Sequence, residues 1–293
     1  MDDRRDHTAA RERLAVSARV TRSAALEWRV EEACLNAWPA LREVLLGGWL
    51  VRFGDGLTRR ANSANPLAPV PDPPIRECEA LYRRQKMPTI FRVPSLLDPS
   101  VDARLAAVGY SSEGDSSVLY GEIDHIHAPP DPDVQILSRP TPEWFEAMAA
   151  LQNHTIEQAS TYRRIIGQIV VPSAFAALVI KREIVALAYG AAHDALLCYE
   201  SVITHPHHRR RSYGRRIVAS LAAWAKENGA EGACLQVESG NVPARALYDA
   251  AGLKCELYRY HYRREPRLQD GQQKRPIGYS NDDFVCDKSV SSE

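Results

Sequence analysis

The sequence predicts an α/β (α+β) fold, because apolar runs of strand length alternate along it with stretches of helical periodicity. The clearest example joins the apolar run Ala195–Ile203, a basic turn after Pro206, and an amphipathic stretch that begins after Gly214. This segment is therefore expected to form a strand, a tight turn and a helix. The apolar side chains that share one face of the expected helix are Ile217, Leu221, Trp224 and Ala225.

Length and composition limit the classes of protein to which the chain can belong. Its 293 residues are enough for two domains of ordinary size, and 37 Lys and Arg balance 37 Asp and Glu. Zero net charge disfavours a general nucleic-acid or membrane-surface role, because the basic charge is local. No apolar run approaches a membrane span, and residues 1–6 lack the apolar core of a signal peptide.

The six cysteines show neither Cys-x-x-Cys spacing nor a zinc-ligand pattern. Several fall in expected strands or helices, where cysteine is a small buried side chain. We therefore expect a cytoplasmic protein that needs no metal.

The first domain is expected over residues 24–124, after a polar extension formed by residues 1–23. It should begin with a strand leading into a helix over Ala25–Ala40. A hairpin is expected between Gly48–Phe53 and Leu57–Ala61 across Gly54-Asp55-Gly56, followed by a loop. The remaining elements should be a helix, a strand, a helix and a strand, at Ile75–Gln85, Thr89–Val93, Val101–Val108 and Ser116–Ile123.

A Pro-rich linker over residues 125–133 and a second domain over residues 134–264 are expected next, before a polar tail at 265–293. The second domain should start with strand Val134–Leu137 and helices Pro142–Leu151 and Ile156–Ile169. After these come strands Ala174–Lys181, Ile184–Ala191 and Ala195–Thr204, the helix after Gly214, strand Ala233–Val237, a helix opened by Asn241, and strand Leu257–Tyr262.

Five arginines crowd the turn before Gly214 and the start of the helix after it: Arg209, Arg210, Arg211, Arg215 and Arg216. A helix start also offers unpaired backbone N–H groups and the positive end of the helix dipole. Together these features predict an anion cradle, and phosphate is the favoured anion. A nucleic-acid contact or a solvated helix start would produce the same pattern.

Two motifs resemble those of the GNAT N-acetyltransferase superfamily. The hexapeptide Arg209–Gly214 resembles the acyl-CoA signature Gln/Arg-x-x-Gly-x-Gly/Ala, with Ser212 in place of the first glycine. Serine fits there if the turn does not require positive φ. The segment Asn241–Leu253 resembles the second motif, Asn-x-x-Ala-x-x-Leu-Tyr followed by a Gly-apolar step. The resemblance covers about half of the chain.

The resemblance implies a mixed, mostly antiparallel sheet flanked by helices, and transfer of acetyl from acetyl-CoA to a primary amine by direct attack. The acceptor would be a small molecule or a peptide, and the protein a monomer or homodimer. Acetyl-CoA would be held by main-chain groups near Val202 and Thr204 and by Arg209, Arg210, Arg211, Ser212, Tyr213, Gly214, Arg215 and Asn241. Helix capping alone would also account for Asn241.

Glu200 is the candidate general base, because burying an ionised carboxylate in an apolar strand is costly and raises its pKa. The alternative is a structural glutamate that faces an edge of the sheet or pairs with arginine, in which case Glu238 or a water chain would serve as the base. Tyr248 is the candidate acid for the leaving thiolate by its place in the second motif, although it could be a packing aromatic. His205, His207 and His208 lack metal-ligand spacing and are expected to face phosphate or solvent.

Residues 24–124 repeat the element order of the second domain, and Gly109-Tyr110 corresponds to Gly252-Leu253. This predicts two tandem GNAT-like domains, the first a degenerate copy that lacks the signature and binds no acetyl-CoA. A chance recurrence of common elements is the alternative. One group of residues could line a cleft between the domains or form a solvated face: Trp49, Arg52, Arg59, Arg60, Asn62 and Asn65.

Two other functions remain compatible with the sequence. One is a catalytically weak module that binds CoA and regulates, for which Ser212 is the hint. The other is nucleic-acid binding through residues 209–216, which lacks interleaved aromatics and a basic face elsewhere.

Overall fold

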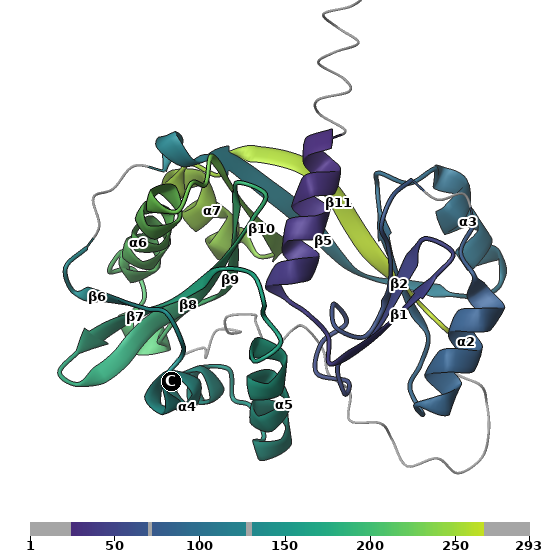
Figure 1. Cartoon of the computed structure of the whole chain (residues 1–293), viewed down its shortest axis with the longest axis horizontal. Helices are drawn as coiled ribbons and strands as arrows, with labels where there is room; N and C mark the ends of the chain where they lie inside the picture. Colours follow the sequence, from purple (N-terminus) through teal and green to yellow (C-terminus); the bar gives the residue numbers. More distant parts are fainter. Residues whose placement is uncertain (1–24, 70–71, 127–130, 267–293) are drawn as a thin grey trace, which may run out of the picture.

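A single eleven-stranded sheet runs through the molecule (Figure 1). The computed structural model describes residues 25–69, 72–126 and 131–266; the expected N-terminal extension and most of the tail lie outside them, as does the middle of the linker. The strand order is β1-β2-β3-β4-β11-β5-β10-β9-β8-β7-β6. Among the described strands, β3 with β4 and β9 with β10 are parallel and the other neighbours are antiparallel. The predicted mixed, mostly antiparallel sheet is confirmed.

The first half of the chain, residues 25–124, supplies five strands and three helices of this fold. A helix over residues 25–37 comes first. It is followed by β1 (Arg42–Leu46), β2 (Trp49–Phe53), β3 (Ala64–Pro66), α2 (Ile75–Arg84), β4 (Ile90–Pro94), α3 (Pro99–Ala107) and β5 (Ser111–Glu122). The strand expected at the start of Ala25–Ala40 is wrong, since that segment is helical from residue 25. β5 starts earlier than expected, because its polar first residues carry no apolar signal and are paired with β11.

The second half, residues 134–264, follows the predicted element order closely. The short helix η1 (Ile123–His125) leads into it. Its elements are β6 (Val134–Leu137), α4 (Pro142–Leu151), α5 (Ile156–Ile166), β7 (Ser173–Ile180), β8 (Glu183–His193), β9 (Leu196–Thr204), η2 (Pro206–His208), α6 (Tyr213–Glu227), β10 (Gly232–Glu238), α7 (Val242–Ala251) and β11 (Cys255–Arg264). The two helices of this half that directly follow β6 have capped starts: Thr141 caps α4, and Thr155 with Gln158 forms a capping box on α5.

The hairpin expected between Gly48–Phe53 and Leu57–Ala61 is wrong. β2 instead pairs with β1 across Gly47-Gly48, and with β3 on its other edge. Both glycines of that turn adopt positive φ, at 55° and 83°, as a two-residue hairpin requires. Two adjacent glycines are as strong a turn signal as Gly-Asp-Gly, and here the hairpin forms at the first of the two signals.

Residues 54–63 form a compact loop between β2 and β3, which we call the β2–β3 loop. The Asn62 Oδ1 accepts hydrogen bonds from the backbone N–H groups of Gly54 (2.8 Å) and Gly56 (3.0 Å). Its Nδ2 donates to the Thr58 carbonyl at 2.6 Å. The Gly-Asp-Gly signal therefore marks a loop that a buried amide holds closed, rather than a strand reversal.

The two halves of the chain exchange their last strands. β5 of the first half lies between β10 and β11, and pairs with β10 from Glu122↔Gly232 to Ser116↔Glu238. β11 of the second half lies between β5 and β4. Outward from this central antiparallel pair, the order is β4-β3-β2-β1 on one side and β10-β9-β8-β7 on the other, with a parallel pair first on each side. Figure 1 shows β5 and β11 crossing together from one half to the other.

This arrangement has the repeat order of a tandem GNAT-like protein. The boundaries given above for the two domains remain a prediction, because the sheet passes through both halves without a break. The segment after β3, residues 67–74, corresponds in strand order to the basic turn after β9, but its sequence is Pro-rich and carries no arginine.

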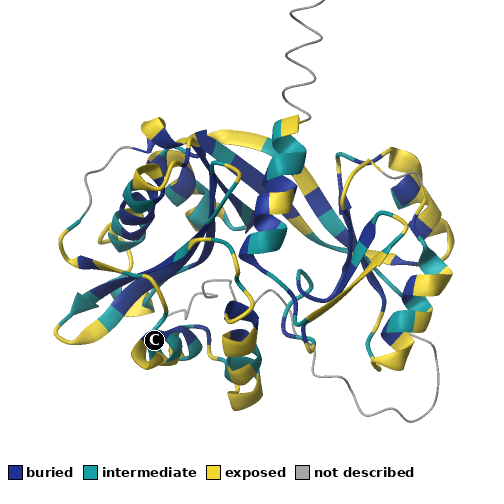
Figure 2. Ribbon diagram, viewed as in Figure 1, coloured by how far each residue is buried: buried dark blue, intermediate teal, exposed yellow. Residues whose placement is uncertain are grey.

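The helix over residues 25–37, purple in Figure 1, covers the centre of the sheet where strands of both halves meet. Its Val30, Ala33 and Ala37 are buried against side chains of β5, β9, β10 and β11. Its Glu31 forms a buried ion pair with Arg92 of β4, whose guanidinium lies 3.7 Å from the centre of the Tyr260 ring. Figure 2 shows buried residues concentrated along the central strands.

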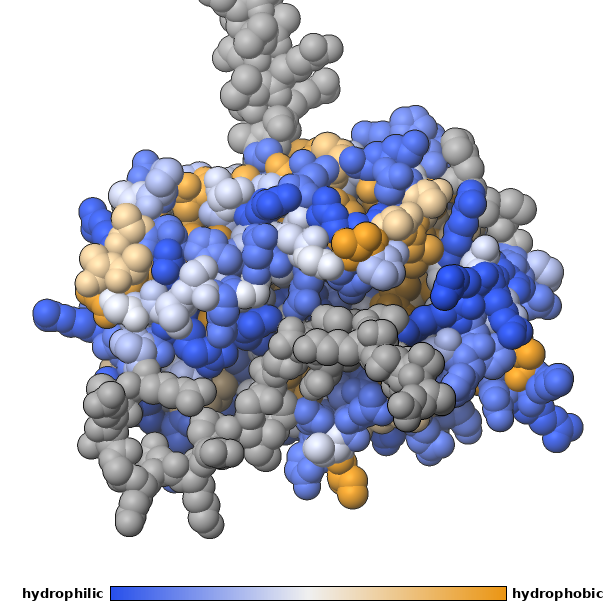
Figure 3. All heavy atoms as spheres, turned by 180° about the vertical axis from the view of Figure 1, so that it is seen from behind, coloured by the Kyte–Doolittle hydropathy of each residue, from blue (hydrophilic) through white to orange (hydrophobic). Residues whose placement is uncertain are grey.

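The described part of the surface seen in Figure 3 is mainly hydrophilic, with apolar residues interspersed among polar ones. Among the described residues, no helix has both the length and the apolar character needed to span a membrane.

Strand exchange predicts that neither half folds alone. A fragment of residues 1–128 retains β4 and β5 but loses β11, which joins them in the sheet. Expressed separately, fragments 1–128 and 129–293 should show poor NMR dispersion and no cooperative thermal transition, whereas co-expression should restore both. A dispersed spectrum and a cooperative melt for fragment 1–128 alone would contradict the exchange.

Candidate functional site

The parallel strands β9 and β10 separate toward their carboxyl ends. Pairing joins Leu196–Cys198 to Gly232–Cys234, whereas β9 continues to Thr204 and β10 to Glu238. Ligands of open α/β sheets bind beyond the carboxyl ends of parallel strands, where the backbones diverge. We call this divergence the β9–β10 fork, and it is the candidate site.

A bulge interrupts β9 at the fork. Ser201 has a φ of 55°, and the register with β8 shifts between Tyr189↔Glu200 and Leu187↔Ile203. A bulge leaves backbone polar groups without a ladder partner, so groups near Val202 can serve a ligand. The Tyr162 hydroxyl of α5 donates to Ser201 Oγ at 2.9 Å and supports this conformation. The main-chain role expected of Val202 and Thr204 remains a prediction.

The basic turn opens α6 as the sequence predicts. Ser212 occupies the N-cap position and the helix begins at Tyr213. Arg216 is not part of the cradle, because it pairs with Asp131 and with Asp133 at 2.7 Å. The exposed arginines at the helix start are Arg209, Arg210, Arg211 and Arg215.

The condition under which serine fits the signature is not met, because Ser212 has a φ of 60° and a ψ of 14°. A residue with a Cβ costs roughly 1–2 kcal/mol in this left-handed region. Gly214 has another role: a Cβ there would lie 3.1 Å from Leu247 Cδ2 of α7 and 3.6 Å from Thr204 Oγ1. Gly214 therefore allows α6 to start close against α7.

Asn241 caps α7, since its Oδ1 accepts a hydrogen bond from the Ala244 N–H at 3.2 Å. Capping thus accounts for the residue, and its contact with the pantetheine arm remains a prediction. Tyr248 of the same helix is buried among apolar residues of the second half. Burial and the negative charge of Glu200 raise the pKa of Tyr248, so the phenol stays protonated and able to donate.

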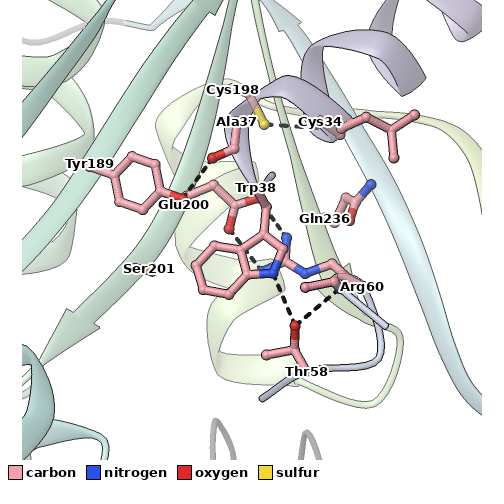
Figure 4. Close-up of polar contacts among 12 residues, drawn as sticks. Cys34, Ala37, Trp38, Thr58, Arg60, Tyr189, Cys198, Glu200, Ser201 and Gln236 are labelled. Atoms are coloured by element: carbon pink, nitrogen blue, oxygen red, sulfur yellow. Dashed lines mark hydrogen bonds and ion pairs between the residues drawn. The ribbon is translucent and has the colours of Figure 1, made fainter. Parts of the chain in front are cut away.

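Glu200 lies on β9 just beyond the last residue paired with β10, and 3% of its side chain is exposed. Its carboxylate accepts two hydrogen bonds from Arg60 of the β2–β3 loop, at 2.5 Å and 2.9 Å (Figure 4). Burial raises the pKa of Glu200, and the positive charge of Arg60 opposes the rise without cancelling it. Glu200 is therefore both a buried carboxylate with a raised pKa and a glutamate paired with arginine, two descriptions that the sequence alone left as alternatives.

Arg59, the residue before Arg60 in the β2–β3 loop, reaches the β10 branch of the fork. Its guanidinium lies 3.8 Å from Glu238 on β10 and 3.7 Å from Glu113 on β5, above the ring of Tyr262. Two successive arginines of the first half thus meet both branches, Arg60 at β9 and Arg59 at β10.

The group expected to line a cleft is divided by the structure. Arg59 and Arg60 reach the second half, whereas the other members are buried within the first: Trp49, Arg52, Asn62 and Asn65. Arg52, for example, donates to the carbonyls of Leu35 and Trp38. No local sequence pattern marks the pairing of Arg60 with Glu200, since the partners are 140 positions apart.

Three cysteines fill the apex of the fork. Cys198 and Cys234 are the last paired residues of β9 and β10, and Cys34 lies over them on the helix 25–37. The three sulfurs lie within 4.8 Å of one another, a proximity that is not by itself evidence of a metal site. Cys78 is also buried and Cys255 is exposed, while Cys286 lies outside the described residues.

A bulged strand, a fork between parallel strands and a basic helix start on a mixed sheet agree with the GNAT resemblance, and comparisons of sequence show that the chain is an N-acetyltransferase of this class. Its particular family is shown by sequence. The family model described as "Probable histone acetyltransferase Rv0428c C-terminal" matches residues 27–263, and the chain belongs to this family.

Individual relatives agree with this assignment. The chain is 25% identical over 240 residues to "Uncharacterized N-acetyltransferase YobR" of Bacillus subtilis, covering 80% of this chain and 97% of that protein. It is 32% identical over 117 residues to "Probable histone acetyltransferase Rv0428c" of Mycobacterium tuberculosis, covering 40% of this chain and 36% of that one.

Solved structures share the fold. A GCN5-related N-acetyltransferase from Kribbella flavida has a TM-score of 0.61 at 18% identity, covering 84% of this chain and 96% of that chain. A tandem GNAT protein from the clavulanic acid biosynthesis pathway has a TM-score of 0.51 at 15% identity, covering 64% and 66%.

The left-handed conformation of Ser212 predicts that glycine would be more stable there. Relief of about 1–2 kcal/mol of strain should exceed the extra unfolded-state entropy of glycine, leaving Ser212→Gly about 0.5–1 kcal/mol more stable in urea unfolding. Ser220→Gly in the interior of α6 is the contrasting control and should destabilise, because glycine is a poor helix former and the buried Ser220 hydroxyl accepts a hydrogen bond from the Asp131 N–H. Destabilisation by Ser212→Gly would contradict the assigned backbone conformation.

Proposed function

We propose that this N-acetyltransferase moves the acetyl group of acetyl-CoA to a primary amine, which attacks the thioester directly. The observation that carries the proposal is the β9–β10 fork, which opens beside the basic start of α6 and holds a buried carboxylate in one branch. Direct attack requires a positioned amine, a proton acceptor and a proton donor, and no covalent nucleophile.

The start of α6 fits the diphosphate of acetyl-CoA. Unpaired N–H groups of the first helical turn, the helix dipole and four exposed arginines all favour an anion there. Bound at this turn, acetyl-CoA would supply the acetyl group as an activated thioester. Backbone groups of the β9 bulge near Val202 and Thr204 would hold the pantetheine arm and polarise the carbonyl.

We assign the base role to Glu200 and keep Glu238 as the second candidate. Both carboxylates lie on branches of the fork, but Glu200 is the more deeply buried of the two. The amine would lose its proton to Glu200, directly or through a water molecule. Tyr248, whose phenol stays protonated, would return a proton to the departing thiolate.

The acceptor is proposed to be a small-molecule or peptide amine. The printed name of the Mycobacterium tuberculosis relative refers to histones, so a lysine-rich peptide belongs in the acceptor panel beside amino acids, polyamines and aminoglycosides. We further propose a cytoplasmic monomer or homodimer without nucleic-acid or membrane partners. Arg216, the fifth arginine of this basic segment, lies in α6 and is already paired with Asp131 and Asp133.

A catalytically weak CoA-binding module is the second candidate function. The pairing of Glu200 with Arg60 favours it, because a carboxylate held by a guanidinium has a lower affinity for a proton. Thiol release with the acceptor panel separates the two functions: turnover supports the enzyme, and tight binding without turnover supports the module.

Removing the exposed arginines should weaken acetyl-CoA binding measured by calorimetry. The triple change of Arg209, Arg210 and Arg211 to Ala should raise Kd roughly tenfold or more, because each lost charge-assisted hydrogen bond to phosphate is worth about 1.5–3 kcal/mol. Arg76→Ala, an exposed arginine on α2, should leave Kd unchanged. Undiminished affinity in the triple variant would place the diphosphate elsewhere.

Glu200→Gln should lower kcat by roughly a hundredfold or more, the usual scale for one general base. The Kd of acetyl-CoA should barely change, and the loss should shrink as the pH rises because more acceptor is then neutral. Thiol-release kinetics across pH, with Glu238→Gln in parallel, make the measurement. Full activity in Glu200→Gln combined with a deficit in Glu238→Gln would move the base role to β10.

A further inference from the structure

We propose that Arg60, supplied by the first half, is a positioning residue of the acetyl-transfer site that holds the Glu200 carboxylate ionised and oriented in the β9–β10 fork. This inference rests on the proposed function, in which Glu200 accepts a proton from the amine. It gives the degenerate first half a part in catalysis.

The contact has the geometry of a positioning interaction. Two guanidinium nitrogens of Arg60 donate to the two carboxylate oxygens of Glu200, at 2.5 Å and 2.9 Å. Such a paired arrangement fixes the plane of the carboxylate as well as its place. The exposed fractions are 3% for the Glu200 side chain and 16% for that of Arg60, so the pair is shielded from water on the Glu200 side.

The structure also fixes Arg60 itself. Its guanidinium lies 5.1 Å from the centre of the Trp38 ring, and the Trp38 indole donates to Thr58 Oγ1 at 3.0 Å (Figure 4). On either side of it in the β2–β3 loop, Leu57 and Ala61 are buried in one core cluster with side chains of α4 and α5. The backbone that carries Arg60 is therefore anchored to that core on both sides of the residue.

Among the described residues, the cationic side chain that contacts the Glu200 carboxylate is that of Arg60. Cys34 of the helix 25–37 and Cys234 of β10 interact with Glu200, and Cys198 of β9 lies beside these two cysteines. Arg52 acts from farther away and is bonded to Glu43. Five tyrosines face the pair from α5, β8, α7 and β11, and each is neutral when protonated: Tyr162, Tyr189, Tyr248, Tyr260 and Tyr262.

The direction of the effect follows from these surroundings. Burial alone favours the protonated carboxyl, and a protonated Glu200 cannot accept a proton from the amine. The charge of Arg60 lowers the pKa that burial has raised. Without Arg60, Glu200 would become ionised only at higher pH, so the acidic limb of the rate profile would move upward.

The first experiment compares kcat/KM across pH for full-length wild type, Arg60→Met and Arg60→Lys, with acetyl-CoA and a lysine-containing peptide. The ratio of variant to wild type cancels the ionisation of the peptide. The acidic limb of Arg60→Met should move up by roughly 1–3 pH units, the effect of one opposite charge, and Arg60→Lys should restore most of it. The matched control is Arg164→Met, which removes an exposed arginine bonded to Asp55 of the same loop and should not move the limb.

The second experiment needs no acceptor and follows the urea midpoint against pH. Since the pKa of Glu200 is raised in the folded chain, stability from this group is present at low pH and is lost as the pH rises through that raised pKa. Arg60→Met should therefore lose more stability than wild type as the pH rises. Adding Glu200→Gln to Arg60→Met should abolish this extra pH dependence.

A pH-independent ratio for Arg60→Met would overturn the inference even if the urea midpoints show coupling, because the pair would then be structural only. The inference would also be overturned if the urea midpoint of Arg60→Met changed with pH by the same slope whether or not Glu200→Gln was added. A wild type that releases no thiol with any acceptor would instead refute the proposed function, and the inference with it.

Discussion

The antiparallel pairing of β5 with β11 is the constraint on which the rest of the structure depends. Each strand ends its own half of the chain but lies against a strand of the other half, so the two repeats form one sheet. This arrangement carries the β2–β3 loop to the carboxyl ends of β9 and β10. As a consequence, Arg59 contacts Glu238 on β10 and Arg60 contacts Glu200 on β9.

Charge is balanced locally within this fork. A buried carboxylate without a partner would lose its charge, and a buried guanidinium without one would be costly, so each half contributes the charge that the other requires. Replacing such a pair with apolar residues is often neutral for stability, which makes stability alone a poor reason for it. A role in setting the ionisation of Glu200 gives the pair a chemical reason.

Much of the second half could be predicted because its signals are local. Helix caps at Thr141 and Thr155, the basic turn and the Asn241 motif each act within a few residues. The strand exchange and the Arg60–Glu200 pair join positions far apart, and no periodicity encodes them. The strained Ser212 was hidden for a different reason: its φ is imposed by the turn, whereas its side chain gives no sign of it. The β2–β3 loop was mistaken for a hairpin because a side-chain amide, rather than a strand partner, closes it.

The central claim is that both halves build one acetyl-transfer site at the β9–β10 fork. A crystal structure of the full chain with coenzyme A tests it most directly. The account predicts the diphosphate at the turn of residues 209–214, with the pantetheine arm running between β9 and β10 toward the Arg60–Glu200 pair. Coenzyme A bound between β3 and β4, or with its thiol directed away from the β2–β3 loop, would contradict it.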